Sequence, residues 1–330
     1  MVGSMARGIL RWTGKALLWL VVVLLVLAAV GMVYQAVVTE RAEGAHPPPG
    51  ETVDVGDHEL HIDCVGQGSP TVVLEAALGN ASAHWVRVQQ EVSEATRVCA
   101  YDRAGMGWSE GGPEPRDAAR VTGELHALLE GAGVEGPYVM VGHSFGGLYA
   151  RAYAARYPDE TAGVVLVDSS HPDQFERLPD GPENYAQARR LFAVAPLFAR
   201  LGVIRLFDLL PVPAELPAPQ RAQVEAFNPA TKQVSTTADE FRATPQTTAQ
   251  VRDAGSLGDK PLAVVSAGKQ PQTWLQLQEE LATLSPNSTH RVVEGATHVS
   301  LLYDPDDARE TSASIVRVVE AARNDQPLAH

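Results

Sequence analysis

Short apolar runs alternate with longer stretches of helical period along most of the chain. The apolar runs, typical of strands buried on both faces, occupy residues 71–74, 97–101, 138–141, 164–167, 262–265 and 290–293. Between them lie stretches with apolar residues three and four positions apart, at residues 83–95, 117–130, 148–156, 274–284 and 308–322. Because parallel strands need crossover connections, this alternation predicts an α/β protein with a mostly parallel sheet.

Two segments depart from this alternation. Residues 52–56 and 59–64 alternate apolar and polar positions around Gly56-Asp57, which predicts a β-hairpin ahead of the first buried strand. Between Asp168 and Pro261 the chain is rich in proline and has no strand pattern, with helical pieces at residues 185–194 and 197–210. Since so long a loop either folds on itself or is functional, we expect a helical lid over about residues 170–259, across the C-terminal edge of the sheet.

The N-terminal segment is apolar enough to cross a membrane. From Ala16 to Thr39 it has 24 residues without a charge, and as a helix they would span ~36 Å, against a hydrocarbon core of ~30 Å. Three basic residues precede this stretch (Arg7, Arg11 and Lys15), and Glu40 and Glu43 follow it. The positive-inside rule then predicts a single-pass membrane protein with a cytoplasmic N-terminus and an extracytoplasmic body.

A cleaved signal peptide is the alternative, with Val26-Leu27-Ala28 as its cleavage site. It would place the body in the same compartment as a secreted protein. The apolar region of an export signal usually has only ~7–15 residues, so the length favours an uncleaved anchor. We therefore divide the chain into a cytoplasmic stub and anchor (residues 1–39), a linker (40–50) and a folded domain (51–330).

Composition and charge narrow the function classes. The chain has 330 residues, 45% of them hydrophobic and 20% charged, with two cysteines, which excludes a disordered chain, a coiled coil and a disulfide-stapled miniature. The net charge is −14, and the first 39 residues carry three basic and no acidic side chains, so the remainder carries −17. A body this acidic repels phosphate backbones, and nucleic acid is not expected as a partner.

The most informative motif is Gly142-His143-Ser144-Phe145-Gly146, which follows an apolar strand and precedes a helical stretch. In this Gly-x-Ser-x-Gly context, glycines remove the Cβ atoms that would collide across a sharp strand-to-helix turn. The turn lifts Ser144 clear of the sheet, and we expect Ser144 to be a catalytic nucleophile rather than a helix cap.

A serine nucleophile needs a base, and the base needs an orienting acid. His298 follows the last predicted strand, in a loop that shares a sheet edge with Ser144, whereas His143 points away and His58 and His61 lie in the hairpin. Asp168 ends the strand beside the elbow and is the expected acid. The alternatives for the acid are Asp173, then Asp304, Asp306 or no acid at all.

An oxyanion hole requires two backbone N–H groups directed at the developing charge. We expect one from Phe145, the residue after the nucleophile. The loop after residues 71–74 (Glu75-Ala76-Ala77-Leu78-Gly79-Asn80) has small residues that let the backbone approach a substrate, and Leu78 is expected to supply the second.

Three motifs together resemble the α/β-hydrolase superfamily, in its capped form with a lid: the loop at residues 76–79, Tyr101-Asp102-Arg103-Ala104-Gly105-Met106-Gly107-Trp108-Ser109, and the elbow at 142–146. The resemblance covers roughly residues 51–323 and implies an eight-stranded, mostly parallel sheet flanked by helices. It also implies that Asp102 and Arg103 fix loop geometry. The family order of nucleophile, acid and histidine agrees with Ser144, Asp168 and His298.

The sequence departs from the family pattern in two places. Ala76-Ala77 stands where His-Gly is usual, and the acid follows the sixth strand rather than the seventh. Members that open epoxides or remove halides have Asp at the elbow, so Ser144 argues against both activities. The family strand order also places Cys64 beside Cys99, which implies a disulfide in an oxidising compartment, with two buried free thiols as the alternative.

The resemblance implies a serine hydrolase that cleaves carboxylic esters without a cofactor or metal. Apolar residues of the lid (191–198, 201, 203, 204, 206 and 207) would either favour an apolar ester or pack the lid onto the core. An amide or peptide hydrolase is an alternative, and would need lid carboxylates turned toward the site (Glu215, Glu225, Asp239 or Glu240). A non-catalytic ligand-binding protein on the same fold is the other alternative. The oligomeric state stays open.

Overall fold

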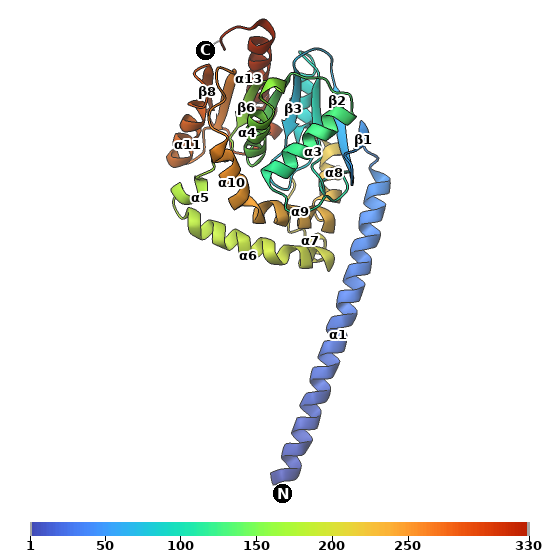
Figure 1. The fold of residues 1–330 in the computed structure, drawn as a ribbon. Helices are drawn as coiled ribbons and strands as arrows, with labels where there is room; N and C mark the ends of the chain where they lie inside the picture. The colour runs from blue at the N-terminus through green and yellow to red at the C-terminus, as the bar shows by residue number, and fades with distance from the viewer. Residues whose placement is uncertain (1, 329–330) are drawn as a thin grey trace.

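An eight-stranded sheet forms the centre of the protein in the computed structural model (Figure 1). The structure describes residues 2–328, with side chains from Trp12 onward, so the side chains of Arg7 and Arg11 lie outside the described part. The strands are β1 (Glu51–Asp54), β2 (Glu59–Val65), β3 (Thr71–Glu75), β4 (Val98–Tyr101), β5 (Tyr138–His143), β6 (Thr161–Val167), β7 (Leu262–Ala267) and β8 (Ser288–Val293).

The order across the sheet is β1-β2-β4-β3-β5-β6-β7-β8. The hairpin strand β2 pairs antiparallel with β1 and with β4, and every other neighbouring pair is parallel. The carboxyl ends of β3, β5, β6, β7 and β8 therefore meet at one edge. The predicted fold class is confirmed, because the crossovers seen in the hydrophobic pattern are the ones a parallel sheet needs.

Helices cover both faces of the sheet, which explains why the central strands are apolar on both sides. One face carries α2 (Val86–Val92), α12 (Ser300–Tyr303) and α13 (Pro305–Asn324), and the other carries α3 (Ala118–Gly131), α4 (Gly146–Arg156) and α11 (Gln272–Ala282). Short 3₁₀ turns occupy Ser82–Trp85 and Pro158–Glu160.

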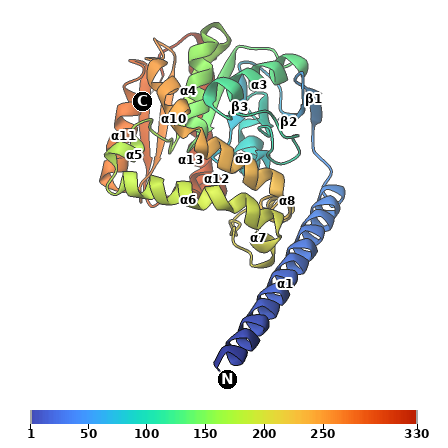
Figure 2. The ribbon, with the colours of Figure 1, turned by 60° about the horizontal axis from the view of Figure 1, so that its bottom comes forward.

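The segment between β6 and β7 folds into helices that lie beyond the carboxyl edge of the sheet (Figures 1 and 2). They are α5 (Gln174–Arg177), α6 (Gly181–Arg200), α7 (Val203–Leu206), α8 (Ala218–Phe227), α9 (Thr231–Arg242) and α10 (Thr244–Asp253). We call these six helices and their connections the lid.

The expected break between two helical pieces at Pro196 is wrong, because α6 continues through that proline to Arg200. Proline removes one donor from the helical ladder, and packing of α6 against α9 keeps the helix together. The chain turns instead at Gly202, whose φ of +72° is readily adopted only by glycine.

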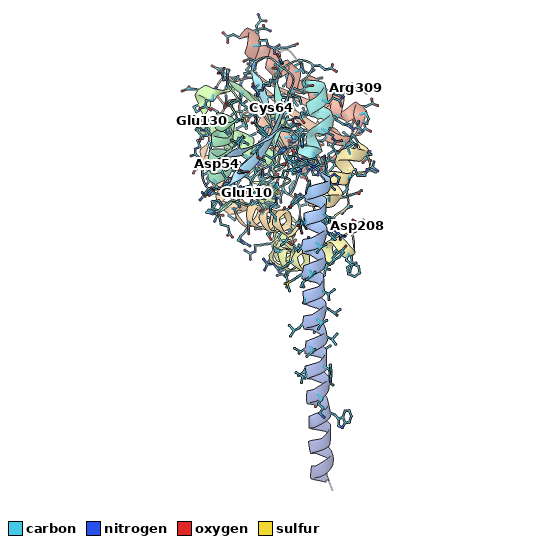
Figure 3. The ribbon with its side chains drawn as sticks, turned by 90° about the vertical axis from the view of Figure 1, so that its right-hand side faces the viewer. Asp54, Cys64, Glu110, Glu130, Asp208 and Arg309 are labelled. Atoms are coloured by element: carbon cyan, nitrogen blue, oxygen red, sulfur yellow. A yellow bond between two sulfur atoms is a disulfide. The ribbon has the colours of Figure 1, made fainter. Side chains whose placement is uncertain are left out.

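Helix α1 (Val2–Ala45) is one continuous rod that projects from the domain (Figure 3). Its segment Trp12–Ala45 is long and apolar enough to cross a membrane by length and composition. The expected linker at residues 40–50 starts too early, because the helix continues through residues 40–45. It ends where Pro47-Pro48-Pro49 excludes helical backbone, leaving residues 46–50 as the irregular connection.

Candidate active site

The strand-to-helix turn after β5 holds Ser144 in a strained backbone conformation. Ser144 has φ of +53°, a region that costs a non-glycine residue ~1–3 kcal/mol. A Cβ at Gly142 would lie 2.5 Å from the backbone of Gly146 and Gly147, so the glycines of the motif are required by the sharpness of the turn. The Ser144 N–H donates to the Val167 carbonyl (3.1 Å), and the Ser144 carbonyl accepts from Ser170 (2.8 Å). The elbow is thereby fixed to the end of β6.

Asp168 follows β6 directly and lies beside this elbow. Its carboxylate accepts a hydrogen bond from Nδ1 of His298, with 2.6 Å between Nδ1 and Oδ2. His298 stands in the loop after β8, and its side chain is one-third exposed while that of Asp168 is fully buried. The two residues expected to act as base and acid therefore meet at the carboxyl edge of the sheet.

Three further donors hold the Asp168 carboxylate. Trp274 Nε1 donates to Oδ1 (2.8 Å), Gln270 Nε2 donates to Oδ2 (2.6 Å), and the Ala267 N–H donates to Oδ1 (3.2 Å). Burial alone would raise the pKa of Asp168. The hydrogen bonds and the charge of His298 outweigh it, so the pKa of Asp168 lies below its ordinary value. Asp168 is thus held as a carboxylate.

The other acids considered for this role lie elsewhere. Asp173 pairs with Arg252 at 2.5 Å between Oδ1 and Nε. Asp304 caps the N-terminus of α13, and Asp306 pairs with Arg309. No hydrogen bond joins any of these three carboxylates to His298 in the described part of the chain.

The neighbouring His143 ties His298 to the elbow. His143 Nε2 donates to the backbone carbonyl of His298 (3.0 Å), and the two imidazole rings are 4.6 Å apart. Burial, reinforced by the charge of His298, lowers the pKa of His143 to about 3, so His143 stays neutral. This agrees with the interpretation of His143 as structural rather than catalytic.

Among the described residues, no hydrogen bond joins the Ser144 hydroxyl to His298. Catalytic hydrogen bonds of this kind are often long before substrate binds. The structure brings the expected base and acid into direct contact, and the expected nucleophile Ser144 follows His143, which hydrogen-bonds to the backbone of His298.

The backbone N–H groups of Phe145 and Leu78 are among those that have no hydrogen-bond acceptor in the described part of the chain. The elbow and the Leu78 loop are in close backbone contact, since a Cβ at Gly146 would overlap the Glu75 carbonyl and lie 2.6 Å from that of Ala76. Leu78 and Phe145 thus lie in adjoining segments at the same edge, where their N–H groups are available to a ligand.

Arg103 supports the loop where Ala76-Ala77 replaces the usual His-Gly. Its guanidinium donates to the carbonyls of Ala76 (2.7 Å) and Ala77 (2.9 Å). It also pairs with Glu75 (2.7 Å) on β3 and with Glu240 (2.8 Å) on lid helix α9. All three charged side chains are buried. Because Arg103 binds Glu240 of the lid and also the carbonyls of Ala76 and Ala77, its guanidinium joins the lid to the loop that carries Leu78.

Glu75 has an unusual electrostatic position. Its second carboxylate oxygen accepts a hydrogen bond from Tyr101. Burial, aided by repulsion from Glu240, raises the pKa of Glu75 to about 7. The Glu75 carboxylate is not free to contact a substrate, because Arg103 and Tyr101 donate hydrogen bonds to its two oxygens.

A cavity of about 430 Å³ opens between this loop and the lid. The loop side is formed by Leu78, Gly79 and Asn80. The lid side is mostly apolar and contains Leu191, Phe192, Ala195, Phe198, Ile204, Leu209, Leu210, Pro211, Asn228, Gln233, Val234 and Thr237. No carboxylate lines this cavity among the described residues. The arrangement fits an uncharged, apolar group next to the expected oxyanion hole.

Sequence reasoning missed the side chains that hold Asp168 and Arg103. Gln270, in the loop after β7, and Trp274 in α11 both donate to Asp168. Their position after β7, the strand next to β6, was the available signal. The pairing of Arg103 with Glu240 joins residues 137 positions apart, and no local pattern indicates it.

The strand order and the arrangement at this edge are those of the α/β-hydrolase fold class, and comparison with known proteins agrees. The sequence pattern of the α/β hydrolase fold family matches residues 70–305, and the chain belongs to that family. An uncharacterized protein of Schizosaccharomyces pombe is 28% identical over 302 residues, which cover 79% of this chain and 54% of that protein. This chain thus spans about half the length of that curated relative.

Solved structures show the same fold at low sequence identity. A thermophilic esterase from Thermogutta terrifontis has a TM-score of 0.61 at 22% identity, covering 80% of this chain and 95% of the esterase. A proposed epoxide hydrolase from Pseudomonas aeruginosa has a TM-score of 0.69 at 17% identity, covering 82% and 96% of the two chains. One is described as an esterase and the other as a proposed epoxide hydrolase, so the likeness shows the fold and does not identify a substrate for this chain.

Proposed function

We propose that this chain is a serine hydrolase that cleaves carboxylic esters with an apolar acyl group. The observation that carries the proposal is the 2.6 Å contact between His298 and the buried Asp168 carboxylate beside the strained elbow of Ser144. An oriented base near a partly exposed serine on this fold is the arrangement that acyl transfer requires.

In this mechanism Ser144 Oγ attacks the ester carbonyl, and its proton passes to Nε2 of His298. The N–H groups of Leu78 and Phe145 stabilise the oxygen that becomes negative, each worth ~3 kcal/mol of barrier. The carbon–oxygen bond to the alcohol breaks, and His298 returns the proton to the departing alkoxide. Water then attacks the acyl-enzyme with His298 as base, releasing the carboxylic acid and Ser144. Asp168 holds the imidazole in its tautomer and stabilises the imidazolium.

The structure does not favour peptide hydrolysis by lid carboxylates. Glu240 is paired with Arg103, and Asp239 with Arg242 at 2.6 Å. Glu215 and Glu225 are exposed and do not line the cavity. None of these four carboxylates is both unpaired and part of the cavity lining, and an ester is the substrate class we propose.

Labelling with a fluorophosphonate probe tests the enzyme against a non-catalytic protein of this fold. The full chain in detergent should be labelled, and Ser144→Ala should not, because the probe phosphonylates an activated serine. Ser169→Ala is a matched control, since Ser169 is a buried serine near the elbow that should be dispensable for labelling. If the wild-type chain is not labelled, the enzyme proposal is wrong.

We also propose that α1 is an uncleaved anchor and that the domain lies outside the cytoplasm. The basic residues before the apolar stretch support this orientation. The disulfide described below is also typical of an oxidising compartment. Protease added to intact cells should remove the domain and leave an anchor fragment, whereas a domain that resists protease until the cells are lysed contradicts this orientation.

A further inference from the structure

The lid carries an exposed apolar surface. This surface lies at the end of the domain beyond which α1 projects. Along α6, Leu191, Val194, Leu197 and Phe198 are exposed at helical spacing, while the opposite side of this helix packs on α9, with the rings of Phe192 and Phe241 4.7 Å apart. The surface continues after α6 with Leu206, Phe207, Leu209 and Leu210. We call these eight residues the lid surface.

Helix α1 packs directly against this part of the lid. A Cβ at Gly31 would overlap the Leu201 carbonyl, and a Cβ at Gly202 would lie 2.9 Å from the ring of Tyr34. Gln35 donates to the Pro229 carbonyl (2.8 Å) and accepts from Arg205 (3.3 Å). The position of the lid relative to α1 is therefore fixed by close backbone contacts.

These contacts set the depth of the lid relative to a bilayer. Gly31, Tyr34 and Gln35 all lie within the uncharged stretch that begins at Ala16. A hydrocarbon core of ~30 Å takes about 20 helical residues, so a core entered at Ala16 ends near Gln35. The turn between α6 and α7 consequently lies at the boundary of the hydrocarbon on the domain's side.

The charge beside the lid surface has the opposite sign to that of the whole chain. Residues 186–210 contain four arginines (189, 190, 200 and 205) and one acid, Asp208, a balance of +3 in a chain of −14. Arg189, Arg190 and Arg200 are exposed next to the apolar stripe of α6. A helix with an apolar face flanked by arginines is typical of segments that lie in the membrane interface and contact anionic headgroups.

We propose that the lid surface lies in the leaflet on the domain's side of the membrane that α1 spans. The view in Figure 3 places Asp208 beside α1 at the margin of the domain nearest the projecting rod, with Glu130 and Arg309 toward the opposite margin. A flat bilayer around α1 would thus meet the lid and leave those two residues in water.

Substrate access follows from this placement, and this part rests on the proposed function. Leu191, Phe198, Leu209 and Leu210 belong to the lid surface and also line the cavity that reaches Leu78. An apolar path therefore runs from the lid surface to the loop that carries Leu78. The acyl chain of a membrane-dissolved ester would enter along it without crossing water.

Spin labels on the full chain test the placement directly. Both cysteines are joined in a disulfide, so an introduced cysteine carries the label. Leu197→Cys (58% exposed) and Phe207→Cys (66% exposed) report on the lid surface, with Glu130→Cys and Arg309→Cys as water-facing controls and Leu24→Cys in α1 as the lipid-facing control. The protein is held in phosphatidylcholine–phosphatidylglycerol nanodiscs with one copy per disc.

Power-saturation spectra then compare relaxation by oxygen, which concentrates in hydrocarbon, with relaxation by a water-soluble nickel chelate. The labels at 197 and 207 should resemble that at 24, with higher oxygen than nickel accessibility, and those at 130 and 309 should show the reverse. Lid labels that resemble the label at 130 overturn the proposal. The proposal is also overturned if, in vesicles, the lid labels are shielded from both reagents and show spin–spin broadening that disappears when unlabelled protein is added. In that case a second copy of the chain covers the lid surface.

An activity arm separates substrate access from catalysis. The double variant Leu197→Glu/Phe207→Glu should lose at least 10-fold in kcat/KM for 4-methylumbelliferyl oleate held in phosphatidylcholine vesicles, and should hydrolyse p-nitrophenyl acetate in water at the wild-type rate. Equal rates on the vesicle-held ester contradict entry from the leaflet. Failure of the wild-type chain to hydrolyse either ester contradicts the proposed function instead, and leaves the spectroscopic result intact.

Discussion

The Nδ1 atom of His298 lies 2.6 Å from Oδ2 of Asp168, although 130 positions separate the two residues in the sequence. The sheet produces this contact, because β6 and β8 flank β7 and both strands run in the same direction. Asp168 leaves the end of β6, and His298 returns over the same edge after β8. The contact is thus a consequence of strand order and not of local sequence.

Replacing this acid should impair catalysis far more than replacing its sequence neighbour. Asp168→Asn keeps the size of the side chain but removes the charge that fixes the imidazole tautomer, and we expect kcat to fall by ~10²–10⁴-fold. Asp173→Asn should keep kcat within a few-fold of wild type, because Asp173 pairs with Arg252. Steady-state kinetics with p-nitrophenyl butyrate compare them, and a larger loss in Asp173→Asn would reassign the acid.

The disulfide between Cys64 and Cys99 should stabilise the sheet where the hairpin joins it. It links the directly paired positions of β2 and β4, with a sequence separation of 35. Closing a loop of that length in the unfolded chain is worth about 3–4 kcal/mol. Cys64→Ala/Cys99→Ala should therefore lower the free energy of unfolding by about that amount, measured by urea titration in mild detergent.

Reduction provides the control for this prediction. Dithiothreitol should destabilise the wild-type chain and leave the double variant unchanged, and the intact mass of the wild type should rise by two hydrogens. A wild-type mass that does not change on reduction would show that the thiols are free, and the double variant should then be as stable as the wild type apart from its lost side-chain packing.

The sequence predicted the sheet and the elbow because their signals are local. The run Tyr138–His143 is fully buried, and the glycines after it are needed where they stand, so apolar pattern and turn chemistry suffice there. Asp168 and His298 could be inferred because each follows a strand at a shared edge. The position of Gln270 and Trp274 after β7 indicates only that they lie near this edge. Their contacts, and that of Glu240, could not be inferred, because they depend on how α11 and α9 are packed, and pattern alone does not specify packing between distant elements.

The burial of His84 predicts a loss of stability in acid. Burial lowers the pKa of His84 to about 4, and its Nδ1 accepts from the Ala81 N–H at 3.1 Å. An unfolded chain has a histidine pKa of ~6.5, so between pH 6.5 and 4 the unfolded state binds a proton that the native state does not. Above pH 6.5 this group does not change the free energy of unfolding. Between pH 6.5 and 4 it lowers the free energy of unfolding by up to ~1.4 kcal/mol for each pH unit of acidification.

His84→Gln removes this proton while its amide oxygen can still accept from Ala81. The slope of unfolding free energy against pH, measured between pH 5 and 6.5 in detergent, should be smaller than the wild-type slope by up to ~1.4 kcal/mol per pH unit. Above pH 7 the difference in stability between the two proteins should not change with pH. Parallel pH profiles across the acid range would show that His84 takes up its proton in the native state.

The cavity between the lid and the Leu78 loop should set the acyl-chain preference. Its volume of about 430 Å³ and its apolar lining accommodate a medium chain, and each buried CH₂ contributes ~0.8 kcal/mol. The wild-type chain should therefore hydrolyse p-nitrophenyl octanoate with a higher kcat/KM than the acetate.

Ala195 lines the cavity from α6, so Ala195→Phe should shorten the available space and lower kcat/KM for the octanoate at least 10-fold, with little change for the acetate. The matched control is Ala193→Phe, since Ala193 is exposed on the same helix and does not line the cavity. Equal octanoate and acetate rates in the wild type would mean that the lid packs on the core without selecting the substrate, and an Ala193→Phe variant that behaves like Ala195→Phe would place the effect in the helix rather than in the cavity.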